Sequence, residues 1–157
     1  MPESVSPNMQ KYYNYREQIT RLKKAMNQSF YLEAIFIEYA VMEDRLESIL
    51  RHAGVWKDPK EGERPKGIEW KIRKAEKVAE EKKSLAHRYF DESLFNRIDE
   101  WRQGRNPLTH VLMKLHLHTE DLQTMAEEGF DIVRILCSKC TSYKRAMEKQ
   151  DLSKKIS

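Results

Sequence analysis

The stretch from Phe30 to Ala53, FYLEAIFIEYAVMEDRLESILRHA, carries apolar residues on two sides of the helix that its periodicity predicts. At about 100° per residue, one face collects a long apolar stripe. Its members are Leu32, Ile35, Phe36, Tyr39, Met42, Leu46, Ile49 and Leu50. Ala34, Ile37 and Val41 form a second apolar patch on the opposite side. Such a helix is expected to lie at the centre of a helical bundle or at a dimer interface.

The remaining sequence continues the helical pattern. Three- and four-residue spacings predict further helices at 8–28, 68–85, from Asp91 to the stretch at 102–110, from Pro107 to about His118, and from about Glu120 to Gln150. Ser29 is expected to cap the central helix, and Gly54 to end it. The chain has only five Gly and five Pro, and strand signals are absent. The sequence therefore predicts an all-α, single-domain bundle of five to six helices.

The predicted organisation is an N-terminal arm at 1–9, a helical domain at 10–150 and a flexible basic tail at 151–157. Within the domain, Gly, Pro and alternating charges predict an exposed loop at 54–67. No signal peptide or membrane span is visible, so no membrane partner is expected. Two cysteines give no disulfide framework, which favours a cytoplasmic location. The net charge of +4 permits binding to a polyanion without requiring it.

Residues 102–110, RQGRNPLTH, combine a helix-start signal with a cation and an imidazole. Asn106 is predicted to be the N-cap and Pro107 the first helical residue. Arg105 and His110 then occupy the two positions that meet in a hydrophobic staple. A helix N-terminus attracts phosphate and favours a neutral, basic imidazole. An arginine, a neutral histidine and a helix start are sufficient parts for cleaving RNA.

The segment RNPLTH resembles the R-N-x-x-x-H motif of HEPN-domain ribonucleases, which are small helical-bundle proteins. The resemblance covers roughly residues 10–150 and implies a homodimer whose two motifs form one composite, metal-independent ribonuclease site. It implies a role as a toxin or in antiviral defence. Arg105 and His110 would be catalytic, and Asn106 would be the third, polar member. Glu43 resembles the acid of the second helix that steadies the motif arginine.

The resemblance also suggests partners. These are RNA, a second copy of the chain, and a cognate antitoxin or regulatory protein; no cofactor is expected. Arg102 and Lys114 are the expected nearby phosphate contacts. Family members regulated by a nucleotidyltransferase antitoxin often carry tyrosine two residues after the histidine. This chain has Leu112 there, so the resemblance does not extend to that regulation.

Glu43 falls near the centre of the longer apolar face of the helix at 30–53. A carboxylate there is costly unless it is paired or hydrated. Either this part of the face is wet, or Glu43 has a basic partner.

Two further groups could suggest a metal site. Cys137 and Cys140 lie on an apolar stripe of the last helix, so core packing is favoured over zinc or redox chemistry. His116 and His118 would point about 160° apart on a helix, which does not suit a metal. No metal is therefore expected.

Other readings of RNPLTH stay open. In the first, the chain is a non-catalytic, HEPN-like helical dimer that binds a protein partner, a nucleotide or RNA at the same basic helix start. In the second, the segment is a capped helix with a solvated Arg–His pair, and its role is purely structural.

Overall fold

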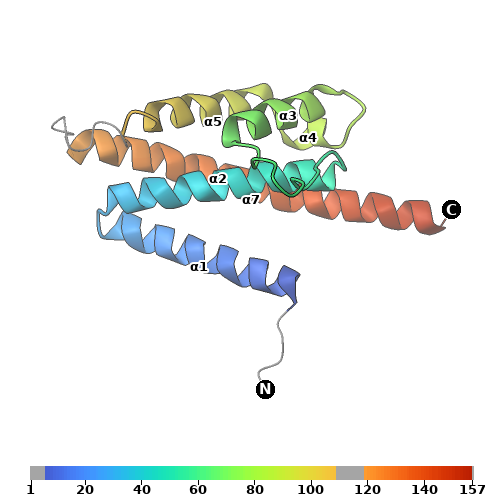
Figure 1. The fold of residues 1–157 in the computed structure, drawn as a ribbon, viewed down its shortest axis with the longest axis horizontal. Helices are drawn as coiled ribbons and strands as arrows, with labels where there is room; N and C mark the ends of the chain where they lie inside the picture. The colour runs from blue at the N-terminus through green and yellow to red at the C-terminus, as the bar shows by residue number, and fades with distance from the viewer. Residues whose placement is uncertain (1–5, 109–118, 157) are drawn as a thin grey trace, which may run out of the picture.

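The computed structural model describes residues 6–108 and 119–156, and every regular element in these ranges is a helix. Figure 1 shows them as one elongated bundle. The helices are α1 (Pro7–Asn27), α2 (Tyr31–His52), α3 (Ile68–Glu80), α4 (Ala86–Tyr89), α5 (Glu92–Arg105) and α7 (Thr119–Ile156). The predicted fold class, an all-α single-domain bundle, is confirmed.

Helix α2 is the central element of the bundle. It packs most extensively against α7 and also contacts α1, α3 and α5. In Figure 1, α1 lies on one side of α2 and α3, α4 and α5 lie on the other. Both predicted apolar sides are used, because Ala34 and Met42 are fully buried. Leu32 and Phe36 are the exceptions, with 42% and 68% of their surface exposed.

Helix ends follow local chemistry in two predicted places. Asp91 caps α5, since its Oδ1 accepts a hydrogen bond from the Leu94 N–H at 2.9 Å. Gly54 ends α2 with a φ of +75°, a left-handed conformation that glycine adopts without a Cβ penalty. The amide of Val55 then donates to the carbonyl of Leu50, as expected for a glycine-terminated helix.

Other ends differ from the prediction. Phe30, and not Ser29, occupies the N-cap position of α2, and its side chain makes no capping hydrogen bond. Ser29 lies one residue earlier in a left-handed conformation with φ +61°. Helix α3 ends at Glu80, and α4 follows a short turn. Helix α7 continues to Ile156 instead of ending near Gln150, since no Gly or Pro interrupts residues 151–156. These residues are therefore helical and exposed.

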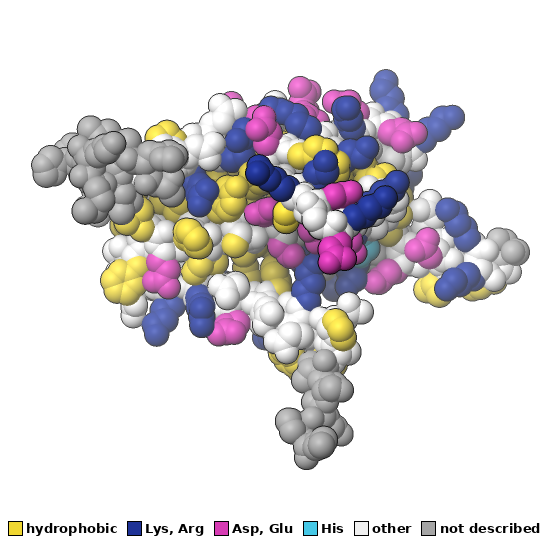
Figure 2. Space-filling view, viewed as in Figure 1, with side chains coloured by type: hydrophobic (Ala, Val, Ile, Leu, Met, Phe, Trp, Pro, Cys, Tyr) yellow, Lys and Arg dark blue, Asp and Glu magenta, His cyan; other side chains and the backbone are white. Residues whose placement is uncertain are grey.

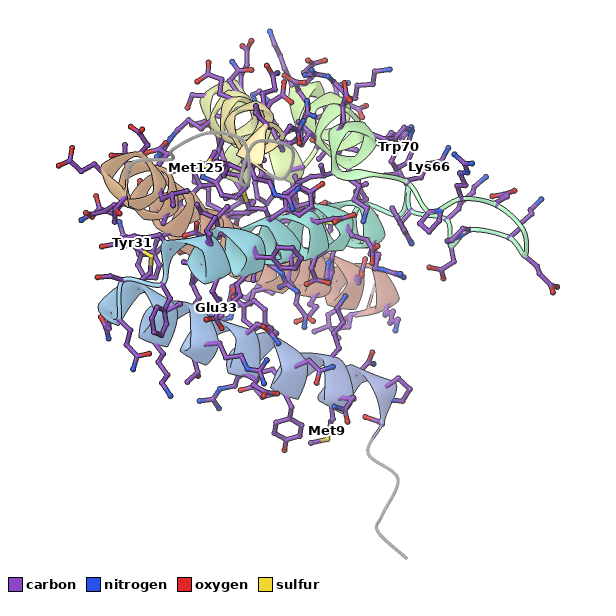
Figure 3. The ribbon with its side chains drawn as sticks, turned by 60° about the vertical axis from the view of Figure 1, so that its left-hand side comes forward. Met9, Tyr31, Glu33, Lys66, Trp70 and Met125 are labelled. Carbon is purple, nitrogen blue, oxygen red and sulfur yellow. The ribbon has the colours of Figure 1, made fainter. Side chains whose placement is uncertain are left out.

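The loop at 54–67 is non-helical and mostly exposed, as predicted. Trp56 anchors it: its indole N–H donates to Asp58, which also accepts a hydrogen bond from Arg51. At the far end of the loop, Lys66 lies beside Trp70, with Nζ 5.3 Å from the ring centre (Figure 3). No helix in the described ranges combines the length and apolar character that a membrane crossing needs.

Candidate functional site

Arg105 is the last residue of α5, and two aromatic rings of α2 hold its side chain. Its guanidinium carbon lies 3.9 Å from the centre of the Tyr39 ring and 5.9 Å from that of Phe36. These are cation–π distances. Arg105 is half-buried. A contact with ring faces fixes the charge without a carboxylate on its N–H groups, so with respect to the described residues these donors can bind an anion.

Asn106 does not adopt the predicted N-cap conformation. It has helical angles, φ −53° and ψ −41°, and its backbone N–H donates to the carbonyl of Arg102 at 3.1 Å. Asn106 is therefore the C-cap of α5, because this bond extends the helix and outweighs the extended preference of a residue before proline. The other two motif-region residues, His110 and Lys114, lie outside the described residues, as do His116 and His118.

Arg102 is held within the fold instead of on the open surface. Only 11% of its side chain is exposed, and Nη2 lies 2.8 Å from Oδ1 of Asp99. Asp99 also accepts a hydrogen bond from Arg73 at 3.0 Å. Burial alone would raise the pKa of Asp99, but the hydrogen bonds and charges of Arg102 and Arg73 lower it below its usual value. The prediction that Arg102 contacts phosphate is therefore not supported, because Asp99 already holds its guanidinium.

Glu43 has the basic partner that its position suggested, but the partner is Lys71. The Lys71 Nζ lies 3.0 Å from a carboxylate oxygen of Glu43 and 3.5 Å from one of Glu47. The Lys71 side chain is only 8% exposed, and it also lies 5.4 Å from the Trp56 ring. Glu43 therefore secures α3 and the loop to α2. In the described residues Glu43 is paired with Lys71, and the contact to Arg105 that was expected of Glu43 is made by Tyr39, one turn earlier.

The buried acid of α2 is Glu38, which sequence reasoning missed. It is fully buried, and within the described part of the chain neither carboxyl oxygen has a hydrogen-bond partner. A Cβ on Gly129 of α7 would lie 2.7 Å from the Glu38 carboxyl carbon and 2.8 Å from the Trp101 indole nitrogen. Glycine is therefore required for this close approach. Burial raises the pKa of Glu38 to about 9, so the group is a neutral acid at pH 7.

The two cysteines pack as predicted. Cys140 is buried and Cys137 is half-buried. Burial raises the pKa of Cys140 to about 12, so its thiol stays protonated at neutral pH. Across residues 6–108 and 119–156, no group of three or more His, Cys, Asp or Glu side chains has a metal-binding arrangement.

The described part of the site thus consists of Arg105 on Tyr39, with Phe36 exposed beside it. Figure 2 shows hydrophobic side chains gathered over the N-terminal part of α2, close to Lys and Arg side chains. The sequence held a signal for these aromatics: Phe36 and Tyr39 are three residues apart and share one face of α2. The missing information was that α5 ends over this face.

Chemically, the arrangement can bind an anion at a fixed place, at the first residue of the RNPLTH segment. A guanidinium is permanently charged, and its fork matches phosphate oxygens. In comparisons with known proteins, no family model matches the chain, and neither a curated protein nor a solved structure matches it.

Proposed function

We propose that this protein is a metal-independent endoribonuclease of the HEPN type, with Arg105 and His110 as its catalytic residues. The observation that carries the proposal is the Arg105 guanidinium, seated 3.9 Å from the Tyr39 ring centre at the end of α5. This contact gives a phosphate-binding charge a fixed position five residues before the motif histidine.

The proposed reaction is an internal transesterification. His110 takes the proton from a ribose 2′-hydroxyl, and the 2′ oxygen attacks the adjacent phosphorus. The bond from phosphorus to the 5′ oxygen breaks, and that oxygen receives a proton from a second, protonated imidazole. Arg105 stabilises the negative charge that builds on the phosphate oxygens. The products are a 2′,3′-cyclic phosphate and a 5′-hydroxyl end.

The second imidazole is assigned to His110 of another copy, which makes the working unit a homodimer. Asn106 is proposed to orient His110 or the phosphate, and Lys114 to contact the RNA backbone. A role as a toxin or in antiviral defence, with a cognate antitoxin or regulatory protein, follows from the motif resemblance. Two unpaired cysteines suit a reducing, cytoplasmic setting.

The test is cleavage of mixed RNA and of a transfer-RNA pool in EDTA by the wild type and by His110→Ala. Loss of the general base is expected to slow cleavage at least about 100-fold. Arg64→Ala is a control for purification and for a substitution outside the site, because Arg64 lies exposed in the 54–67 loop. Equal cleavage by the wild type and His110→Ala, or a requirement for added divalent metal, would refute the mechanism.

The second candidate is a non-catalytic dimer that binds a protein partner, a nucleotide or RNA. The large exposure of Phe36, which borders Arg105, and of Leu32, about one helical turn before Phe36, favours a binding surface there. RNA binding that persists in His110→Ala, with no cleavage by a folded, dimeric wild type, would support this candidate over the nuclease.

A further inference from the structure

We infer that Phe36 is a base-stacking residue of the same site and that the substrate must therefore be unpaired RNA. The inference rests on the proposed function and adds a specificity-determining residue to it. Phe36 projects from the N-terminal part of α2, the central helix of the bundle, and 68% of its surface is exposed. Ile35 and Ile37, its neighbours in sequence, are buried.

Phe36 has a fixed relation to the charge of the site. The Arg105 guanidinium carbon lies 5.9 Å from the centre of the Phe36 ring and 3.9 Å from that of Tyr39. The cation is thus seated on Tyr39 and borders Phe36. A phosphate bound to Arg105 would bring the base of its own or the adjacent nucleotide within reach of the Phe36 ring. Phosphate and base would then be bound by neighbouring groups.

The Phe36 ring and the Arg105 charge together favour a nucleotide as the ligand. Phenylalanine has no polar atom, so its exposed ring gains no hydrogen bond from water. Every nucleobase has a π-face that stacks on such a ring, and phosphate supplies the negative charge that complements Arg105. An apolar protein segment would satisfy Phe36 but would leave the Arg105 charge without a partner.

Two other exposed aromatics of the described chain also lie beside a cation, Tyr12 beside Arg16 and Trp70 beside Lys66, but neither cation belongs to the RNPLTH motif. Tyr12 and Tyr13 contact each other with ring centres 5.8 Å apart, and the Tyr12 hydroxyl accepts a hydrogen bond from Arg16 at 3.4 Å. Lys66 covers one side of Trp70, which is 36% exposed (Figure 3). Among the exposed aromatics of the described residues, Phe36 is the one that borders Arg105, the cation that begins the RNPLTH motif.

This placement restricts the form of the RNA. In an A-form duplex the bases are stacked on one another and cannot present a face to a protein ring. An unpaired nucleotide in a loop, bulge or tail can. Single strands and loops are therefore expected to bind and to be cut, and continuous duplex is not.

The test measures the anisotropy of a labelled single-stranded RNA and of the same sequence as a duplex. All proteins carry His110→Ala, so that the RNA stays intact. Phe36→Leu keeps an apolar side chain but has no π-face, Phe36→Trp keeps the face, and Tyr13→Ala is a control aromatic on α1. Phe36→Leu is expected to weaken single-strand binding about tenfold. Phe36→Trp and Tyr13→Ala are expected to bind as the parent does.

Three results would overturn the inference: single-strand affinity unchanged in Phe36→Leu, equal affinity of the parent for duplex and single strand, or Phe36→Leu turning a dimer into a monomer by light scattering. The last would assign Phe36 to an interface between copies. Failure of the nuclease proposal gives a different result. In that case the wild type does not cleave RNA, but Phe36→Leu still weakens the binding of single-stranded RNA. Conversely, if Phe36→Leu cleaves RNA as fast as the wild type does, the nuclease proposal stands and the role of Phe36 is refuted.

Discussion

The two sides of α2 differ in which side chains they bury and which they expose. The inner side, toward α7, buries the acid Glu38 against Gly129 and Trp101. The outer side leaves Phe36 in solvent and places the cation of Arg105 beside it. A carboxyl group is thus inside and a phenyl ring outside, two residues apart on one helix.

Under the proposed function, the difference separates a side of α2 that serves stability from a side that serves recognition. On the inner side the carboxyl group avoids a buried charge by staying protonated, so it has no charge to offer a ligand at pH 7. On the outer side the charge of Arg105 is permanent, and an aromatic ring fixes its place. Changes to the inner side should therefore alter stability, and changes to the outer side should alter RNA cleavage.

The largest effect is expected from Arg105→Ala, which removes the charge of the outer side. Loss of a group that stabilises transition-state charge should lower the cleavage rate about 100- to 1,000-fold. The free energy of unfolding should change by no more than about 2 kcal/mol, the size of a partly desolvated cation–π contact. Cleavage assays and urea unfolding measure the two effects. Equal loss of stability and activity would place Arg105 with the inner side instead.

Gly129→Ala should be the most disruptive change on the inner side. Its Cβ would meet the Glu38 carboxyl carbon at 2.7 Å and the Trp101 indole nitrogen at 2.8 Å, so destabilisation of about 3 kcal/mol is expected. Adding Glu38→Ala should recover part of it in a double-mutant cycle. Gly104→Ala is the matched control, because it meets only the flexible end of Met125 at 3.2 Å. A Gly129→Ala protein as stable as the control would refute the close packing.

Glu38→Gln should remove a pH dependence from the unfolding free energy. Burial raises the pKa of Glu38 from its ordinary value of 4.5 to about 9 in the folded protein. The folded state therefore holds a proton that the unfolded state releases, so wild-type stability should fall as pH rises from about 4.5 toward 9. Between pH 5 and 7 the wild type should lose about 2 kcal/mol relative to Glu38→Gln.

Chemical unfolding of both proteins at several pH values measures this effect. Glu33→Gln, which removes a carboxylate from the exposed surface of α2, is the matched control. If wild type and Glu38→Gln keep a constant difference across this range, the acid is not the neutral, buried group described here.

The smallest effect is expected from Tyr39, which positions Arg105 without touching the substrate. Tyr39→Leu should lower cleavage about fivefold through loss of the cation–π contact. Tyr39→Phe should retain the wild-type rate, because the ring and not the hydroxyl holds the guanidinium. The loss should appear in kcat more than in KM, and a Tyr39→Phe protein as slow as Tyr39→Leu would contradict the positioning role.

The sequence predicted what periodicity and local chemistry determine. The central, two-sided α2 follows from its apolar spacing, and the cap by Asp91 and the end at Gly54 follow from residue type. The helical state of Asn106 was missed because the backbone bond to Arg102 outweighs the local preference before Pro107.

The acids of α2 show the limit of prediction from periodicity. The sequence pattern drew attention to Glu43, but the fully buried acid is Glu38. A helical wheel identifies sides but not the helices that cover them. Glu43 lies within the longer apolar stripe, yet Lys71 reaches it from α3. Glu38 lies beside the smaller patch, where α7 approaches closely at Gly129 and seals it. The ring partners of Arg105 were missed for the same reason, because only the fold brings α5 over Phe36 and Tyr39.

The most direct test of the central claim is the chemistry of the RNA ends made in EDTA, determined by mass spectrometry of the fragments. The account predicts 2′,3′-cyclic phosphate and 5′-hydroxyl ends, which disappear with His110→Ala and with Arg105→Ala. Fragments with 3′-hydroxyl and 5′-phosphate ends would contradict attack by the 2′-hydroxyl, and with it the roles assigned to Arg105 and His110.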